Sequence, residues 1–450
     1  MSVSTQSPRR TRGQLLVACL VVALPAFAAF ASAVQSEALP TTCQPAGPPV
    51  PAAHALNPLE PVAPNAERGF AVAAFEPGYG AQLVAIGSRF DGASCGGAVY
   101  LFMSTRDGFE EQLHYDSTQQ GEQLGISVAL HGDTLAVGAP GQQQTGKERP
   151  GGTVYVFQLT FAHDDSGRRR IERTDRITDL PAGLASLGPA IALDDDLLAV
   201  SATMPGAGGV LGAVLLYKLP YVPGSMPRVL MPRVPQAGDR FGESLAFSNG
   251  TLIAGAPGRS GNAGQAAAGA VYLFPLADSE QPFGELRPQQ EAADAQFGSS
   301  LSASGMSLAV GAVGAGAPVG LPLGGPGAVY VFTVGDGTWT EQAVLAPDSA
   351  HAAPGERFGQ AVAIHGEFLV VGAPLSSVAT FAGGASFLFQ FQSRAGVWAE
   401  VQGFTVDGTA MHGLFGSAVA LLSDAALVGA PLAGQGMGVV QIYPVEEVTP

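Results

Sequence analysis

The feature that most limits how this chain can fold is a phrase that recurs seven times along it. Each copy opens on a leading glycine, runs through two short apolar stretches, and ends the second of them at Gly-Ala-Pro or a degenerate form of it. The leading glycines stand at positions 69, 125, 188, 242, 298, 359 and 416, with spacings of 56, 63, 54, 56, 61 and 57 residues. Self-similarity at such a period indicates a repeat architecture in which each copy is one structural unit.

Each unit has the pattern of a four-stranded antiparallel meander. The first strand follows the leading glycine, and a two-residue turn such as His131-Gly132, Asn249-Gly250 or His365-Gly366 fits a hairpin that needs positive φ. The second strand ends at proline, which stops a ladder without removing an interior donor. The third is Val-Tyr-Val-Phe or a close variant. A fourth, more polar strand is expected at residues 109–115, 339–345 and 397–406.

The intact copies share a leading glycine, mostly preceded by phenylalanine, and a glycine and proline at the end of the second strand. These residues are Gly125, Gly138, Pro140, Phe241, Gly242, Gly255, Pro257, Phe297, Gly298, Gly311, Phe358, Gly359, Gly372, Pro374, Phe415, Gly416, Gly429 and Pro431. In the first three units the phenylalanine is replaced by Arg68, Leu124 and Leu187. We expect those units to pack less regularly.

The first two strands of each unit are apolar without clean alternation, which indicates sheets covered on both faces. Sheets stacked around an axis meet this requirement, so we predict an all-β fold, a seven-bladed β-propeller of four-stranded antiparallel blades over residues 55–447. The last unit has only three apparent strands before the sequence stops at Pro450. Residues 55–64 are predicted to add the missing outer strand and so close the ring.

The repeated Phe-Gly and Gly-Ala-Pro residues resemble the FG-GAP repeat family, best known from the propeller head of integrin α subunits. The resemblance covers about residues 55–445. Many members of that family carry a calcium-binding loop of spaced Asp and Gly between the first and second strands. Here this connection is reduced to a bare turn, as at residues 130–133, 247–250 and 364–367, which is too short for a cage of oxygen ligands. We therefore expect no metal and no cofactor.

The first 33 residues have the pattern of a signal peptide. Arg9, Arg10 and Arg12 precede an apolar run over residues 15–30, and Ala31-Ser32-Ala33 offers small residues for cleavage. The predicted products are a signal peptide at 1–33, an extension at 34–54, and a secreted, periplasmic or cell-surface protein with no membrane span after cleavage. The formal net charge of −16 argues against a nucleic-acid partner.

Two cysteines remain after the predicted cleavage, Cys43 and Cys95. A pair of thiols in an exported chain favours one disulfide, which would tie the extension to the first blade. The alternative is two unrelated free thiols.

Several clusters that could carry chemistry have simpler interpretations. Asp194-Asp195-Asp196 falls where a turn is expected, and His131 and His365 occupy equivalent turn positions in two repeats, so turn preference explains them better than metal binding. Residues 168–170, all arginine, fit an exposed charged edge. No motif of a catalytic nucleophile or zinc centre is found, so no catalytic residue is assigned.

Function is expected on the connections that differ between copies, at residues 141–151, 258–268, 313–326 and 375–383. Variable loops on a rigid ring commonly host binding sites. The sequence favours a monomeric, non-enzymatic scaffold that binds a protein or glycan through these loops. Two alternatives remain: an enzyme acting on polysaccharides, a lyase or hydrolase with carboxylates gathered at the ring centre, and a purely structural cell-surface component.

Overall fold

The computed structural model divides the chain into two units, Met1–Glu37 and Ala38–Pro450, and all described residues belong to the second. They are residue 56 and residues 65–78, 81–141, 151–163, 169–178, 180–184, 186–206, 209–276, 284–316, 325–347, 353–377, 383–405 and 413–445. Within them every regular element is a strand. This part of the chain contains no helix that is long and apolar enough to cross a membrane. The predicted signal peptide and the whole predicted extension, residues 34–54, lie outside the described residues.

The strands form seven antiparallel sheets in chain order, which we call blades 1 to 7. Blades 1 to 3 consist of β1 (Arg68–Gly78), β2 (Ala81–Ser88), β3 (Ala98–Thr105) and β4 (Gly108–Asp116); β5 (Ser127–His131), β6 (Thr134–Ala139), β7 (Thr153–His163) and β8 (Arg169–Ile177); and β9 (Ser186–Asp194), β10 (Leu197–Gly206), β11 (Gly209–Lys218) and β12 (Arg228–Leu230). Blades 4 to 7 consist of β13 (Leu245–Ser248), β14 (Thr251–Ala256), β15 (Ala270–Pro275) and β16 (Gly284–Leu286); β17 (Phe297–Ser304), β18 (Ser307–Ala312), β19 (Ala328–Gly335) and β20 (Thr338–Leu345); β21 (Ala361–His365), β22 (Phe368–Ala373), β23 (Ala385–Gln392) and β24 (Val397–Phe404); and β25 (Ala418–Leu421), β26 (Ala425–Ala430) and β27 (Val439–Pro444).

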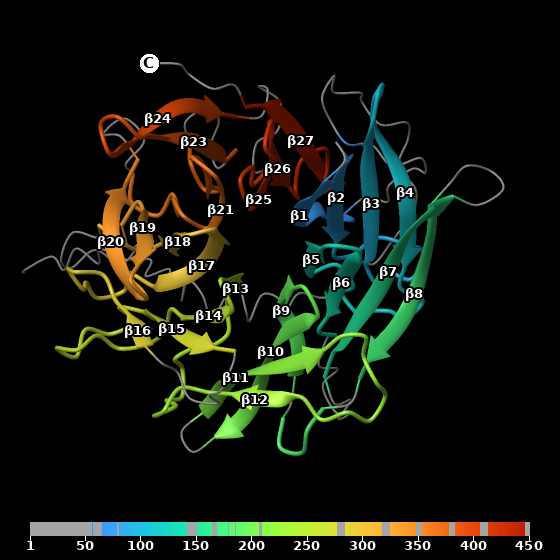
Figure 1. Ribbon diagram of the computed structural model, residues 1–450, viewed down its shortest axis with the longest axis horizontal. Helices are drawn as coiled ribbons and strands as arrows, with labels where there is room; N and C mark the ends of the chain where they lie inside the picture. The colour runs from blue at the N-terminus through green and yellow to red at the C-terminus, as the bar shows by residue number, and fades with distance from the viewer. Residues whose placement is uncertain are drawn as a thin grey trace, which may run out of the picture. The chain divides into compact units, whose positions relative to one another are not determined.

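The blades stand in a ring, with the first strand of each innermost (Figure 1). Each inner strand contacts the inner strand of the next blade, from β1 to β5 and onward to β25, and β25 contacts β1. Each blade hydrogen-bonds its strands in simple sequence order, as a meander does. The predicted all-β, seven-bladed propeller is therefore confirmed.

The glycines of the repeated phrase lie where neighbouring blades touch. A Cβ added to the second-strand glycine would stand 1.9 to 2.2 Å from the carbonyl oxygen of the leading glycine in the next blade. This contact pairs Gly87 with Gly125, Gly138 with Gly188, Gly255 with Gly298, Gly311 with Gly359, Gly372 with Gly416, and Gly429 with Gly69. Blade 3 has Ser201 at this place, opposite Gly242. No side chain larger than hydrogen fits six of the seven seams, which explains why the phrase keeps both glycines.

The leading glycines have a second requirement. All seven adopt a left-handed φ, between 82° and 91°, which residues with a Cβ adopt at a cost. This conformation turns the chain from the previous blade into its new inner strand. The leading glycine is thus needed for its backbone conformation, and the second-strand glycine is needed for the close approach of two backbones.

The ring closes between blades 7 and 1. Arg68 forms a parallel bridge with Gly438, and the backbone N–H of Glu67 donates to the Gly436 carbonyl at 2.9 Å. Leu56 is the one described residue of the predicted closing strand. It is buried, and its N–H donates to the carbonyl of Val440 on β27 at 3.1 Å, where an outer strand of blade 7 is expected. The other residues of 55–64 lie outside the described part.

The predicted turn positions are correct in one case and wrong in two. Asn249-Gly250 forms the turn between β13 and β14, with φ of 47° and 69°. His131 and His365, however, are the last paired residues of β5 and β21, and the turns are Gly132-Asp133 and Gly366-Glu367. A glycine can occupy either turn position, so it locates the hairpin only to within one residue. Asn tolerates the left-handed region better than His, which explains the correct case.

The replacements for the repeat phenylalanine remain interior residues. Leu124 and Leu187 are fully buried, and Arg68 is almost fully buried, with Nη2 donating to the Gly438 carbonyl at 3.3 Å. Burial lowers the pKa of this guanidinium. The predicted exposed arginine edge falls partly within β8, at Arg169–Ile177. Residue 168 lies outside the described residues.

The predicted disulfide between Cys43 and Cys95 can be tested directly. Cys95 is buried in the loop between β2 and β3, and Cys43 lies outside the described residues. We expect peptide mapping without reductant to recover the two cysteines in one joined peptide pair. We also expect Cys95→Ser to destabilise the mature protein by about 2 kcal/mol, through loss of a constraint on the unfolded chain. Separate peptides with alkylated thiols would support the alternative of two free cysteines.

Candidate functional site

The meander divides the connections between two faces of the ring. The loops between second and third strands, together with the connections that lead into each new blade, share one face, which we call the loop face. The first-to-second turns share the opposite face, which we call the turn face. The six described first-to-second connections contain two or three residues each, and the third-to-fourth connections, such as residues 219–227 in blade 3, emerge on the same face.

Of the four variable loops expected from the sequence, the one in blade 4, at residues 257–269, is described over its whole length. Its first anchor is Arg259, whose Nη1 lies 2.7 Å from Oδ2 of Asp239 and donates to the Val234 carbonyl at 2.9 Å. The two charged side chains are only 14% and 5% exposed. Burial raises the pKa of Asp239, although Arg259 opposes this. A buried pair of this kind holds the loop against the connection from blade 3.

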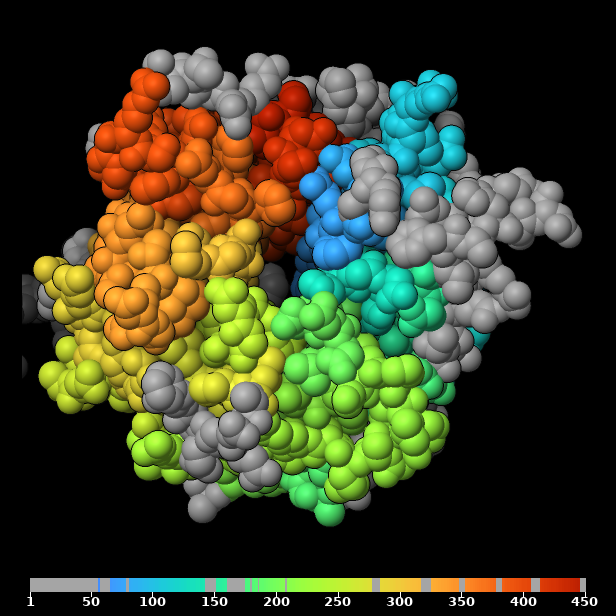
Figure 2. All heavy atoms as spheres, viewed as in Figure 1, coloured from blue at the N-terminus to red at the C-terminus, as the bar shows by residue number. Residues whose placement is uncertain are grey.

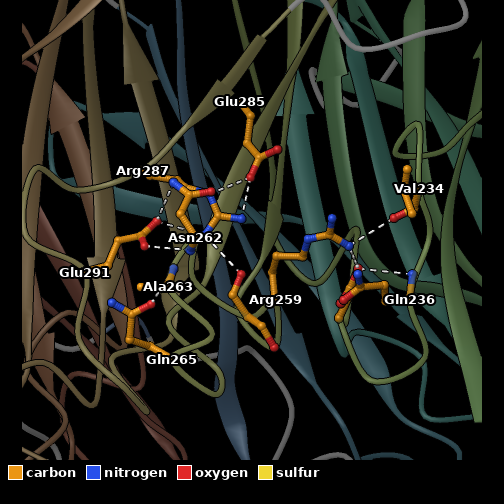
Figure 3. A network of polar contacts seen from close by, with 11 residues as sticks. Val234, Gln236, Arg259, Asn262, Ala263, Gln265, Glu285, Arg287 and Glu291 are labelled. Atoms are coloured by element: carbon orange, nitrogen blue, oxygen red, sulfur yellow. Dashed lines mark hydrogen bonds and ion pairs between the residues drawn. The ribbon is translucent and has the colours of Figure 1, made fainter.

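The second anchor is Glu291, on the connection to blade 5. Its carboxylate accepts hydrogen bonds from the backbone N–H of Asn262 at 2.7 Å and from the Asn262 side chain at 3.2 Å. Arg287 pairs with the same carboxylate at 3.0 Å, and also donates to the Ser260 carbonyl at 3.1 Å. Figure 3 shows these residues converging around the loop, with Gln265 closing its tip through the N–H of Ala263. Residues from three consecutive connections thus fix one loop conformation.

A second polar group lies where blades 4, 5 and 6 start. We call Arg240, Glu243, Gln296, Ser299, Arg357 and Gln360 the channel cluster. In each blade one member precedes the Phe-Gly pair and the other follows it, and the three preceding residues have φ of 54°, 56° and 62°. Arg240 pairs with Glu243 at 3.0 Å and donates to Oε1 of Gln296 at 3.1 Å. The face of the ring in Figure 2 is hollowed at its centre, toward which the inner strands converge.

The charges of the channel cluster perturb one another. Burial raises the pKa of Glu243 to about 7, although Arg240 and Arg357 both favour its ionised form. Burial, together with repulsion from Arg240, lowers the pKa of Arg357 to about 10. Arg240 belongs to blade 4 and Arg357 to blade 6, so these interactions join blades that are not neighbours. Guanidiniums from two different blades therefore act on the carboxylate of Glu243.

On the turn face, the structure brings together His131 and the Asp194–Asp196 run, which were interpreted from the sequence as unrelated turn residues. His131 ends β5. Asp195 and Asp196 form the turn after β9, as predicted, whereas Asp194, which was also predicted in the turn, is the last paired residue of β9. Single ligand atoms of His131, Asp194 and Asp195 lie within 4.8 Å of one another. His131 Nε2 is 3.4 Å from Asp195, whose side chain is 90% exposed. Burial raises the pKa of Asp194, and His131 opposes this. The group forms a polar contact between blades 2 and 3.

Sequence reasoning did not find the channel cluster. The signal was present, because the cluster occupies two fixed offsets of the repeat, one before and one after the Phe-Gly pair. The spacing of the repeats alone does not show that these two positions face the axis of the ring. This becomes clear only when the inner strand of each blade is known. Among the six residues of this cluster Glu243 is the one carboxylate.

Comparison with known proteins gives one family match. A model described as FG-GAP repeat matches residues 109–157, 229–274 and 339–389. No curated protein matches the chain. Among solved structures, one described as a candidate 6-phosphogluconolactonase from Bacteroides fragilis is similar at 14% identity and a TM-score of 0.45, covering 75% of this chain and 84% of that one.

Each of the three matched segments begins in or near the fourth strand of one blade and ends in the third strand of the next. Each therefore spans a seam between blades, with its leading glycine and second strand. The same seam contacts recur around the ring, including places where the phrase is degenerate. The chain is a seven-bladed β-propeller that carries FG-GAP repeats.

Proposed function

We propose that this protein is an exported, non-enzymatic scaffold that binds a protein or glycan ligand through its loop face without calcium. One observation carries the proposal: the loop of residues 257–269 is held in place by charged residues with little exposure while its tip is exposed. The tip residues Asn262, Ala263 and Gly264 are exposed, whereas Arg259 of the loop pairs with Asp239, and Glu291, on the connection to blade 5, accepts hydrogen bonds from Asn262. A loop ordered before binding loses less conformational entropy when a ligand arrives.

Apolar surface next to this loop adds to the argument. Val210, near the start of β11, and Val234, on the connection from blade 3 to blade 4, are both exposed, and the N–H of Gly238 on that connection donates to the Val210 carbonyl at 3.3 Å. An ordered polar loop beside exposed apolar side chains resembles the mixed composition of protein interaction surfaces. The first-to-second turns are short hairpins in the described residues, while the turn face also carries the longer third-to-fourth connection of blade 3, at residues 219–227.

Site-specific photo-crosslinking tests which face binds. A photoreactive phenylalanine derivative is placed at Ala263 on the loop face, or at Met306, which is 67% exposed in a turn of blade 5. The tagged mature protein is irradiated with its own cell envelope and matrix, and adducts are read by mass and by glycan staining. We expect adducts from position 263 and few from position 306. Equal yields, or adducts from position 306 alone, would contradict the proposal.

A third variant tests the role of loop order. Arg287→Ala removes the contacts to Glu291 and to the Ser260 carbonyl. We expect it to reduce the yield from position 263 while leaving the thermal transition of the ring nearly unchanged, because the network lies outside the blade seams. An unchanged yield would show that order in this loop does not contribute to binding.

A further inference from the structure

Blade 3 carries much of the exposed apolar surface of the ring. Five of the ten large apolar side chains that are exposed in the described residues lie between positions 210 and 234. Val222 and Met226, in the connection from β11 to β12, are 64% and 77% exposed, and Val229 on β12 is also exposed. Single exposed apolar side chains are ordinary, but several gathered on one blade indicate a contact surface.

The connection that carries Val222 and Met226 has a fixed shape. The N–H of Ser225 donates to the Val222 carbonyl at 2.9 Å, which closes a turn between the two apolar side chains. Tyr221, at the base of this turn, is buried, and its ring lies edge-on to that of Tyr217 with the ring centroids 5.9 Å apart. Val222 and Met226 therefore project from a turn that is anchored in the core of the blade.

The outer part of blade 3 is also basic, in a chain whose net charge is −16. Residues 197–238 contain Lys218, Arg228 and Arg233 and no acidic residue. Lys218 and Arg233 are exposed, and Arg228 is half-buried. Asp196 lies 3.5 Å from Lys218, but both side chains are mostly exposed, so this ion pair contributes little attraction.

The neighbouring blade extends this charge. Its outer strand, β8, contains four arginines and two acidic residues, Glu172 and Asp175. One of the arginines, Arg176, pairs with Glu122 at 3.4 Å. Figure 1 shows blades 2 and 3 side by side, with β8 and β12 on the outside of the ring. Basic residues thus outnumber acidic ones along the outer strands of two adjacent blades.

We propose that the outer side of blades 2 and 3 binds an anionic lipid surface. Val222 and Met226 enter the layer of lipid headgroups, and Lys218 and Arg233 lie beside lipid phosphates. Binding to a membrane surface combines burial of apolar side chains with attraction of basic residues to anionic lipids, and this region offers both. The negative charge elsewhere in the chain opposes the approach only weakly, because salt screens charges over about 10 Å.

A lipid surface fits this region better than other anionic partners do. An acidic polysaccharide has no apolar layer in which Val222 and Met226 could be buried. A protein partner needs a pocket that matches a projecting turn, whereas a lipid layer adapts to it. The inference goes beyond the proposed function and does not rest on it, because residues 219–227 lie on the turn face and residues 257–269 on the loop face.

Vesicle sedimentation of the mature protein tests the inference. The vesicles contain phosphatidylcholine alone or an equimolar mixture with phosphatidylglycerol, which adds anionic headgroups. We expect the mixed vesicles to be bound about tenfold more tightly, and a higher salt concentration to weaken this binding. Val222→Ser combined with Met226→Ser is expected to weaken binding to the mixed vesicles by about tenfold, through loss of buried apolar surface.

The matched control is Val344→Ser combined with Met306→Ser, which removes another exposed valine and methionine, both from blade 5. We expect this variant to bind the mixed vesicles as the wild type does. Arg233→Gln is expected to weaken binding by about fivefold, and Arg394→Gln, at an exposed turn of blade 6, to leave it unchanged. Thermal transitions of all variants serve as the folding control.

Equal binding of both kinds of vesicle, or equal binding by the two double variants, would overturn the inference. If the protein binds no vesicles but forms a dimer that the variant at positions 222 and 226 loses, the region is a contact between two copies and the lipid inference is wrong. The proposed function is judged separately, by crosslinking from position 263.

Discussion

Gly311→Ala is expected to lower the free energy of unfolding by about 3 kcal/mol, because the new methyl group has no space. Its Cβ would stand 2.1 Å from the carbonyl oxygen of Gly359 in the next blade and 2.2 Å from Oγ of Ser300. The carbonyl belongs to a backbone that is itself fixed by a left-handed glycine, so it cannot move aside alone. The blades must separate locally, which disturbs the packing on both sides of the seam.

Gly335→Ala provides the matched control in the same blade. A Cβ at Gly335 meets nothing within 4 Å, and its φ is not left-handed. This substitution is expected to be neutral or slightly stabilising, since alanine reduces the freedom of the unfolded chain. Urea unfolding of both variants measures the difference. Equal midpoints would show that the seams between blades tolerate a methyl group, and that close backbone approach does not explain the repeated glycine.

Phe358→Ala is expected to lower the free energy of unfolding by about 3 to 5 kcal/mol, the usual cost of removing a buried aromatic ring. Phe358 is fully buried and lies 5.6 Å from the ring of Phe387 and 6.1 Å from that of Phe389. It packs with Val329 and Val331 of blade 5 as well as with its own blade. Its removal therefore leaves a cavity between two blades.

Phe358→Leu is the matched variant, because the chain already uses leucine at this place in blades 2 and 3. Leu124 and Leu187 are both fully buried there. We expect this variant to cost about 1 kcal/mol, since most of the apolar volume is kept. Denaturant unfolding again provides the measurement. If leucine and alanine cost the same, the aromatic ring rather than the filled volume is what this position requires.

The fold follows from the sequence because each requirement of the propeller falls at a fixed place in the repeat. Gly242 and Gly298 need a left-handed φ, and Gly255 and Gly311 need close approach, so the motif residues report backbone geometry directly. Finer positions are less well determined. The turns at His131 and His365 are displaced by one residue, since a glycine identifies a hairpin but not which turn position it occupies.

The candidate sites depend on relations between repeats, which a linear pattern does not contain. Arg240 and Arg357 act on one another from blades 4 and 6, and His131 meets Asp195 from the next blade. Each residue alone looks like a solvated turn or loop position. Only the ring, with its inner strands in contact, brings equivalent offsets of different repeats to the same place. The signal peptide, the disulfide and the export of the protein stay predictions.

The uniform seam has a consequence for how the molecule assembles. Six seams use the same glycine against the same carbonyl, so this backbone contact by itself does not distinguish the correct neighbouring blade from any other. Covalent connectivity, rather than recognition between surfaces, then dictates the order of assembly. The seam between blades 3 and 4 differs, because Ser201 stands opposite Gly242 there. This contact can distinguish the correct pair of blades from the others. We therefore expect chains that refold at high concentration to exchange blades with one another.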